Sequence, residues 1–156
     1  LLGSEPKIDL LQWGIRTNLE HRGIRDFQPL KLGAQAQVDD SLIYNGCVID
    51  GTVERSILFP GVHVKKGAVV RDSVLFFNNI VGENAVFDKV VSDVNTVVGA
   101  GTRVGGTGPI LDREATVLGW NNHVPAETVI GSNCTIYPEL PPEKFNREIH
   151  SGEIIR

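Results

Sequence analysis

The residues of this sequence that could take part in catalysis are few and scattered. His123 lies in the polar stretch 121–125, Asn-Asn-His-Val-Pro. A histidine can act as a general base when its pKa is near neutral and the proton it removes is within reach. The other histidines, His21, His63 and His150, lie in separate segments without metal-ligand spacing, so we expect no metal site. A lone histidine in a polar turn is more often only a turn residue, and both interpretations of His123 stay open.

A second candidate is a cationic, aromatic stretch near the start of the chain. Arg16, Arg22 and Arg25 fall within ten residues, close to Trp13. Guanidinium groups bind phosphate through paired hydrogen bonds, so these arginines could hold an anionic effector or contact a partner domain. The alternative is a linker whose charges only keep it solvated.

The composition excludes several other classes of protein. With 15 Lys+Arg against 19 Asp+Glu, the 156 residues carry a net charge of −4, so we expect no nucleic-acid-binding face. No apolar run reaches the 18 residues of a membrane span, and no signal peptide is recognisable, so we predict no membrane contact and a cytoplasmic location. The chain begins at Leu1 rather than Met, which we interpret as a fragment of a longer protein.

The elements that must position these residues repeat along the chain. There are 19 Val and 13 Ile, which favours strands. Four similar segments begin 15, 17 and 17 residues apart, at Val38, Val53, Val70 and Phe87. Aliphatic or aromatic anchors recur at intervals of five or six. These are Val64, Val70, Phe76 and Val81, and later Leu118, Val124, Ile130 and Ile136. This period fits neither a helix nor a long antiparallel strand and predicts a triangular solenoid with three short sheets.

The repeats also resemble a known family. Segments 81–85, 98–102 and 130–134 each have an aliphatic residue, then Gly, then a small residue at the fifth position, which resembles the hexapeptide-repeat pattern. The resemblance implies an all-β, left-handed parallel β-helix, an exception to the usual right-handed crossover. We expect a non-repeat linker or cap over residues 1–32, the β-helix over 33–138 and a C-terminal tail over 139–156.

Other polar and reactive residues find places within this repeat. A period of 17 aligns Cys47 with Val64, Val81 and Val98, and Cys134 takes a small inward position, so we expect two buried thiols too far apart for a disulfide. The corner positions Asp40, Arg55, Asp72 and Lys89 alternate in sign and predict a solvated charge ladder. The glycine-rich stretch 99–104 also belongs to the repeat, which argues against a phosphate-binding loop.

A closer resemblance covers roughly residues 8–104. The Trp-x-Ile-Arg-Thr stretch at 13–17, the coil Gly46–Gly51 and the Val-x-x-Ser repeats look like the C-terminal part of bacterial glucose-1-phosphate adenylyltransferases, the ADP-glucose pyrophosphorylase family. The resemblance implies a parent enzyme that makes ADP-glucose from ATP and glucose 1-phosphate for glycogen synthesis. Its catalytic residues and Mg²⁺ belong to an N-terminal domain that this chain lacks.

The resemblance also implies a role for the present chain. In that family the β-helix domain supports a homotetramer and helps form a sugar-phosphate effector site at the junction with the catalytic domain, for which Arg16, Arg22 and Arg25 are the candidates. We expect no catalytic residue and no cofactor in this chain. Two alternatives remain, a hexapeptide-repeat acyltransferase with His123 as general base and a non-catalytic, pyrophosphorylase-like structural subunit.

Overall fold

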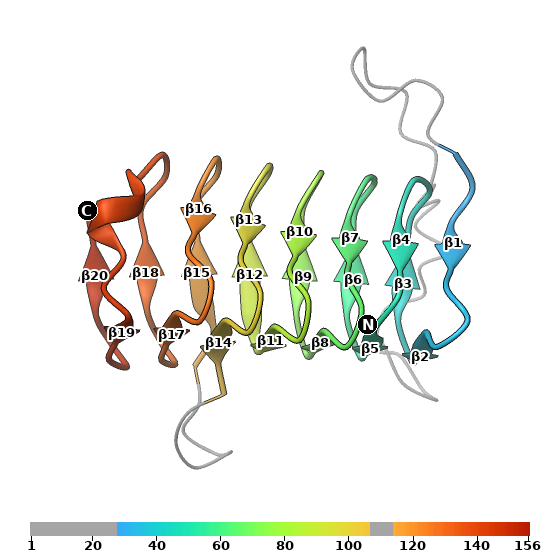
Figure 1. Cartoon of the computed structure of the whole chain (residues 1–156), viewed down its shortest axis with the longest axis horizontal. Helices are drawn as coiled ribbons and strands as arrows, with labels where there is room; N and C mark the ends of the chain where they lie inside the picture. Colours follow the sequence, from blue (N-terminus) through green and yellow to red (C-terminus); the bar gives the residue numbers. More distant parts are fainter. Residues whose placement is uncertain (1–27, 107–113) are drawn as a thin grey trace, which may run out of the picture.

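The protein is a left-handed parallel β-helix, as the hexapeptide pattern predicts. The computed structural model describes residues 28–106 and 114–156. Within these ranges the chain winds through three parallel sheets, A, B and C, which form the sides of one solenoid (Figure 1). Each coil contributes one two- or three-residue strand to a sheet before the chain turns a corner.

Every strand pairs in parallel with the equivalent strand one coil away. Sheet A contains β1 (Lys31–Leu32), β4 (Val48–Ile49), β7 (His63–Val64), β10 (Ile80–Val81), β13 (Val97–Val98) and β16 (His123–Val124). Sheet B contains β2 (Gln37–Asp39), β5 (Thr52–Glu54), β8 (Val69–Arg71), β11 (Val86–Asp88), β14 (Arg103–Gly105), β17 (Val129–Ile130) and β19 (Glu148–Ile149). Sheet C contains β3 (Leu42–Ile43), β6 (Ile57–Leu58), β9 (Val74–Leu75), β12 (Val90–Ser92), β15 (Thr116–Leu118), β18 (Thr135–Ile136) and β20 (Ile154–Ile155).

The core is a stack of aliphatic columns inside the solenoid. The expected column Val53, Val70, Phe87 and Val104 is confirmed, because these residues pair across sheet B and are each at most 1% exposed. The later anchors, six residues apart, also point inward and are buried: Leu118, Val124, Ile130 and Ile136. Neighbouring strands lie about 4.8 Å apart, so each inward side chain packs directly on the equivalent residues of the adjacent coils.

Two assignments made with the fixed period are wrong. Ile49, not Cys47, is the residue that pairs with Val64 in the neighbouring strand. Only two residues separate β4 from β5, whereas four separate β7 from β8, so that coil is 15 residues long. The inward anchor after Val70 is Leu75, which is fully buried, and the Phe76 ring instead stacks outside on Phe59 with centroids 4.8 Å apart. The columns follow strand pairing rather than a constant count of residues.

The corner between sheets B and C carries the predicted charge ladder. Arg55 Nε and Nη2 donate to Asp72 Oδ1 and Oδ2 at 2.8 and 2.9 Å. The corner residues Asp40, Arg55, Asp72 and Lys89 all adopt positive φ, between 39° and 62°, which brings equivalent side chains of successive coils together at the surface. These ion pairs are exposed, so each one contributes little to stability.

The serines of the Val-x-x-Ser segments form a second ladder beside these charges. The Ser73 backbone N–H donates to Ser56 Oγ at 3.1 Å, and the Val90 N–H donates to Ser73 Oγ at 3.0 Å. Each hydroxyl also donates to the carbonyl two residues earlier, so the corner leaves none of these polar groups unpaired. The recurring serine therefore has a structural cause, which is to carry backbone pairing around the corner.

We expect the Arg55–Asp72 pair to make a small, pH-dependent contribution to stability. Arg55 lowers the pKa of the Asp72 carboxyl from its ordinary value of 3.8, so the pair stabilises the fold above that pH and is lost as the pH falls through the lowered value. Because Asp72 is 40% exposed, Asp72→Asn should cost no more than about 1 kcal/mol at pH 7. Urea unfolding of both proteins should show this gap closing as the pH falls below 3.8. A gap that persists there would contradict the ion-pair origin.

The sheets continue beyond the expected boundary at residue 138. Strands β19 and β20 pair with β17 and β18, and Ile149 joins the inward column behind Ile130. The intervening segment contains the short 3-10 helix η2 (Pro142–Lys144) and places Phe145 in the core. Its prolines hide the hexad period, so the sequence pattern indicated a tail where the structure adds another partial coil.

Candidate functional site

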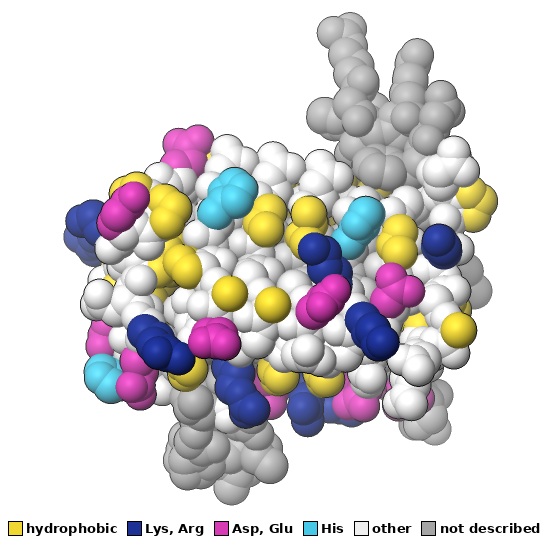
Figure 2. Space-filling model, viewed as in Figure 1, with side chains coloured by type: hydrophobic (Ala, Val, Ile, Leu, Met, Phe, Trp, Pro, Cys, Tyr) yellow, Lys and Arg dark blue, Asp and Glu magenta, His cyan; other side chains and the backbone are white. Residues whose placement is uncertain are grey.

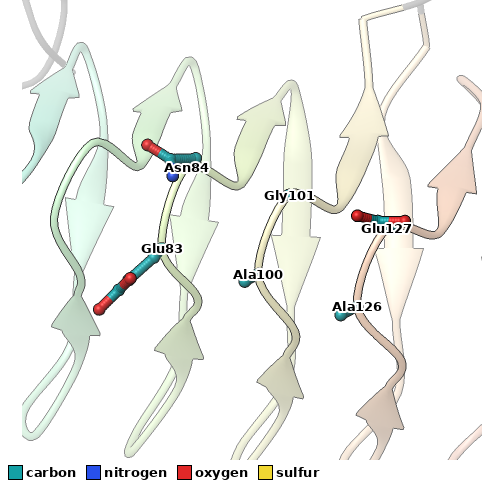
Figure 3. Close-up of a pocket in the computed structure, with 6 residues that line it drawn as sticks. All are labelled: Glu83, Asn84, Ala100, Gly101, Ala126 and Glu127. Atoms are coloured by element: carbon teal, nitrogen blue, oxygen red, sulfur yellow. The ribbon is translucent and has the colours of Figure 1, made fainter.

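The candidate site on the described surface is a shallow notch at the corner between sheets A and B. It has a volume of about 350 Å³ and is lined by Glu83, Asn84, Ala100, Gly101, Ala126 and Glu127. These residues come from three successive turns, which follow β10, β13 and β16 (Figure 3). The middle turn carries only Ala100 and Gly101 at the surface, so it forms a floor lower than the turns on either side.

The backbone of these turns explains which residue types line the notch. Asn84, Gly101 and Glu127 occupy the same turn position, with φ between 55° and 67°. Asn and Gly tolerate this region best, since other residues bring Cβ close to the backbone there. The lining residues are therefore first of all turn residues.

The polar groups of the notch do not converge on one point. The Glu83 carboxylate points away from Ala100 (Figure 3). At the other end, Glu127 Oε2 accepts from Arg147 Nη2 at 3.2 Å, and both side chains are largely exposed. A nucleophile and a general base held within hydrogen-bond distance would define an enzyme site. The lining of the notch contains no such pair.

His123 lies on the outer face of sheet A, in the last strand of that sheet. Its side chain is exposed and makes no hydrogen bond or ion pair with the rest of the chain in the described ranges. His63 occupies the same outward column, but Ile80 and Val97 lie between them. At about 4.8 Å per strand the two imidazoles are about 14 Å apart, too far to share a proton or a metal. Figure 2 shows histidines on this face with hydrophobic side chains between them.

Neither the described histidines nor the described acidic residues form a metal site. No group of three or more His, Cys, Asp or Glu side chains that could hold a metal ion occurs in residues 28–106 and 114–156. These residues therefore do not fit a Mg²⁺ site. In the same ranges no helix is long and apolar enough to cross a membrane.

The two cysteines are buried, and the thiol of each donates a hydrogen bond to a backbone carbonyl. Cys47 Sγ donates to the Phe59 carbonyl at 3.2 Å, and Cys134 Sγ donates to the His150 carbonyl at 3.1 Å. Burial raises the pKa of both thiols above the ordinary value of 9.0. A buried thiol with a raised pKa is a poor nucleophile, so both cysteines act as core residues.

Of the sequence-predicted site residues, His123 lies in the described part of the chain, and no other candidate from that part lies beside it. Arg16, Arg22 and Arg25 lie outside the described residues. Sequence reasoning did not single out the notch, because its residues belong to the repeat and differ from other turns only in side-chain size. The signal that could have found it is the pair of small residues at 100–101, between turns that each carry a glutamate.

Comparison with known proteins places this β-helix in a family. The family described as GlmU-like, C-terminal hexapeptide matches residues 27–118. The chain belongs to this family of hexapeptide-repeat β-helices.

Among curated proteins, the chain is similar to glucose-1-phosphate adenylyltransferases. It is 32% identical over 141 residues to that of Desulforamulus reducens, covering 87% of this chain and 34% of the relative. The corresponding protein of Acetivibrio thermocellus is 34% identical over 122 residues, which cover 73% of this chain and 29% of the relative. That of Bacillus mycoides is 36% identical over 104 residues, which cover 63% and 28%. The chain thus spans about a third of the length of these relatives.

The comparison with solved structures adds little. The acetyltransferase domain of PglB from Neisseria gonorrhoeae FA1090 is 19% identical, with 86% of this chain and 52% of that chain covered and a TM-score of 0.35. A TM-score this low does not establish a shared overall shape.

Proposed function

We propose that this chain is the regulatory and assembly domain of a glucose-1-phosphate adenylyltransferase, an enzyme that makes ADP-glucose from ATP and glucose 1-phosphate for glycogen synthesis. The observation that carries the proposal is the identity of 32–36% to such enzymes over about a third of their length. Nucleotidyl transfer and its Mg²⁺ then belong to a catalytic domain outside this chain.

The fold suits a domain that transmits a regulatory signal and assembles subunits, rather than one that catalyses a reaction. Parallel coils paired along their whole length make a stiff rod, because each coil is fixed by hydrogen bonds to both neighbours. A stiff rod can hold a catalytic domain at one place and another subunit at another. In this proposal the protein is a cytoplasmic homotetramer, and a sugar-phosphate effector binds at the junction between the two domains.

We expect the 156-residue chain alone to form no ADP-glucose and to transfer no acetyl group from acetyl-CoA to an amine or sugar. The parent enzyme should form ADP-glucose when ATP, glucose 1-phosphate and Mg²⁺ are supplied. Acetyl transfer by the isolated chain that disappeared in His123→Ala would replace this proposal with an acyltransferase. A parent protein that makes no ADP-glucose would indicate the non-catalytic structural subunit.

Arg16, Arg22 and Arg25 are the proposed effector-binding residues. In the parent enzyme, replacing one of them by alanine should raise the effector concentration for half-maximal activation about tenfold or more, because a charge-assisted hydrogen bond to phosphate is lost. The KM values for ATP and glucose 1-phosphate should stay within about twofold, since the substrates bind in the other domain. Activity would be titrated with the sugar-phosphate effector at fixed substrate concentrations.

The matched control is Arg103→Ala, which removes an exposed arginine from the outer face of sheet B. It should leave the activation curve unchanged. If all three N-terminal variants behave like this control, the segment is a linker and not an effector site.

A further inference from the structure

One side of the solenoid is predominantly apolar. The outward residues of sheet C are aliphatic in every strand except β18, which carries Thr135. Two further outward columns run along the adjoining corner between sheets C and A, and they include the stacked rings of Tyr44, Phe59 and Phe76. We call these three columns the apolar face. Its apolar members are Leu42, Ile57, Val74, Val91, Val117, Ile154, Tyr44, Phe59, Phe76, Tyr137, Pro60, Phe77, Val94, Trp120 and Pro138.

The other sides of the solenoid differ in kind. Sheet B presents the charged residues Glu54, Arg71, Asp88 and Arg103 on its outer face. Sheet A interrupts its outward column with Lys31, His63 and His123. A row of hydrophobic side chains is therefore not a general consequence of the hexapeptide repeat, which constrains only the inward positions.

Most of the large hydrophobic residues that are exposed to solvent also lie on the apolar face. In the described ranges, Leu30, Leu32 and Val38 are exposed in or beside β1 and β2, the end strands of sheets A and B. The remaining exposed ones belong to the apolar face: Val117 (41%), Trp120 (44%), Tyr137 (42%) and Ile154 (55%). A continuous apolar patch of this extent marks an interaction surface in a water-soluble protein.

Self-association buries almost no charge on this face. Among the described residues, the three columns of the apolar face contain one carboxylate, that of Asp93. Its Oδ1 already accepts a hydrogen bond from the Val94 N–H at 2.8 Å. At the C-terminal edge, the Arg156 guanidinium lies 5.1 Å from the centroid of the Tyr137 ring. Two copies placed face to face would thus meet through aliphatic and aromatic side chains, avoiding the desolvation cost of unpaired ions.

The dimensions of the face fit a dimer interface. Seven strands about 4.8 Å apart give it a length of about 30 Å, and one hexad of extended chain gives a width of about 20 Å. The flat area is about 600 Å², which side-chain relief enlarges toward the roughly 800 Å² that each partner contributes to a standard protein interface. A face of this size that is the same in every copy suits an isologous, two-fold contact.

We propose that the apolar face of sheet C is the surface on which a second copy of this chain docks, face to face. The proposal deepens the assembly role given above and rests on it. It assigns the contact to one side of the solenoid and leaves the charged outer face of sheet B facing solvent.

The test is the mass of the purified 156-residue chain, measured by light scattering and sedimentation between about 1 and 100 µM. Wild type should have twice the 17.0 kDa chain mass. The variant Val74→Lys/Val91→Lys places two charges at the centre of the face and should weaken dimerisation at least 100-fold. Val117→Lys changes a side chain that is already 41% exposed, so it should fold normally and still weaken the dimer.

The matched control is Val69→Lys/Val86→Lys. These valines are also half-buried, outward and centrally placed, but in sheet B. The control should dimerise as wild type does, and far-ultraviolet circular dichroism should show that both double variants are folded. A larger wild-type assembly supports the proposal if the sheet C variants, and not the control, reduce its mass.

Three results would overturn the proposal: a monomeric wild type at 100 µM, sheet C variants that keep the wild-type mass, or a control that dissociates equally. The second result would point to contact through the solenoid ends, which these substitutions do not touch. The mass measurement is independent of ADP-glucose synthesis, so a parent enzyme without that activity would refute the proposed function and leave this interface standing.

Discussion

Replacing Val70 by aspartate should lower the free energy of unfolding by about 4 kcal/mol or unfold the solenoid outright. Val70 is fully buried and pairs with Val53 and Phe87 in the inward column of sheet B. A carboxylate at this position has no water and no cation. It must either stay ionised without a partner or take up a proton at a strongly raised pKa, and both states cost free energy.

The matched control for this substitution is the adjacent residue. Val69→Asp makes the same chemical change one position earlier, where the side chain points outward and is half-buried. Its expected cost is about 1 kcal/mol, the range of strand propensity. Urea unfolding followed by circular dichroism would compare the two variants. Equal midpoints would show that the inward and outward positions of sheet B are wrongly assigned.

A second large effect is expected at Gly99, where two coils approach closely. A Cβ added at Gly99 would lie 2.4 Å from the Ala126 backbone nitrogen and 2.6 Å from its Cα. These are backbone atoms of the next coil, which the sheets on either side hold in place, so the coils must separate locally. Gly99→Ala should therefore cost about 3 kcal/mol, at the upper end of overpacking effects.

Gly101→Ala separates this steric effect from the loss of glycine itself. Gly101 lies in the same turn, with φ +67°, and its nearest neighbour to an added Cβ is Glu127 Cγ at 3.7 Å. Its cost should be about 1 kcal/mol, from the left-handed backbone alone. Thermal unfolding would measure both variants. A greater loss at Gly101 than at Gly99 would show that coil spacing does not limit this corner.

The notch and the apolar face illustrate why a solenoid has few polar groups available for catalysis but large outer faces available for contacts. Columns fill the interior, and polar ladders run along two of the three corners. Serines and charges line the corner between sheets B and C, and an exposed chain of amides from Asn78 to Asn95 to Asn121 lines the corner between sheets C and A. Polar groups so used are already paired with each other. What remains is the outer face of each sheet, where residue type is free to vary, and there the three sides of this protein diverge.

The sequence by itself determined the fold class. Inward positions admit only aliphatic or small side chains, because the interior of a three-sided coil is narrow and every layer stacks on the next, and this requirement imposes the hexad spacing. It also determined the charge ladder, since residues such as Arg55 and Asp72 occupy equivalent corners of coils of equal length. Similarity to a family could be recognised from the same repeats.

Only the tertiary structure decided how coils of unequal length align. The first complete coil is two residues short, so Ile49 replaced Cys47 in its column, and Leu75 rather than Phe76 turned inward. Ile149 and Ile155 joined their columns after a proline-rich excursion that breaks the period. Outward residues carry no periodic constraint, so the apolar face became visible only when strand pairing placed residues 15 to 26 positions apart side by side.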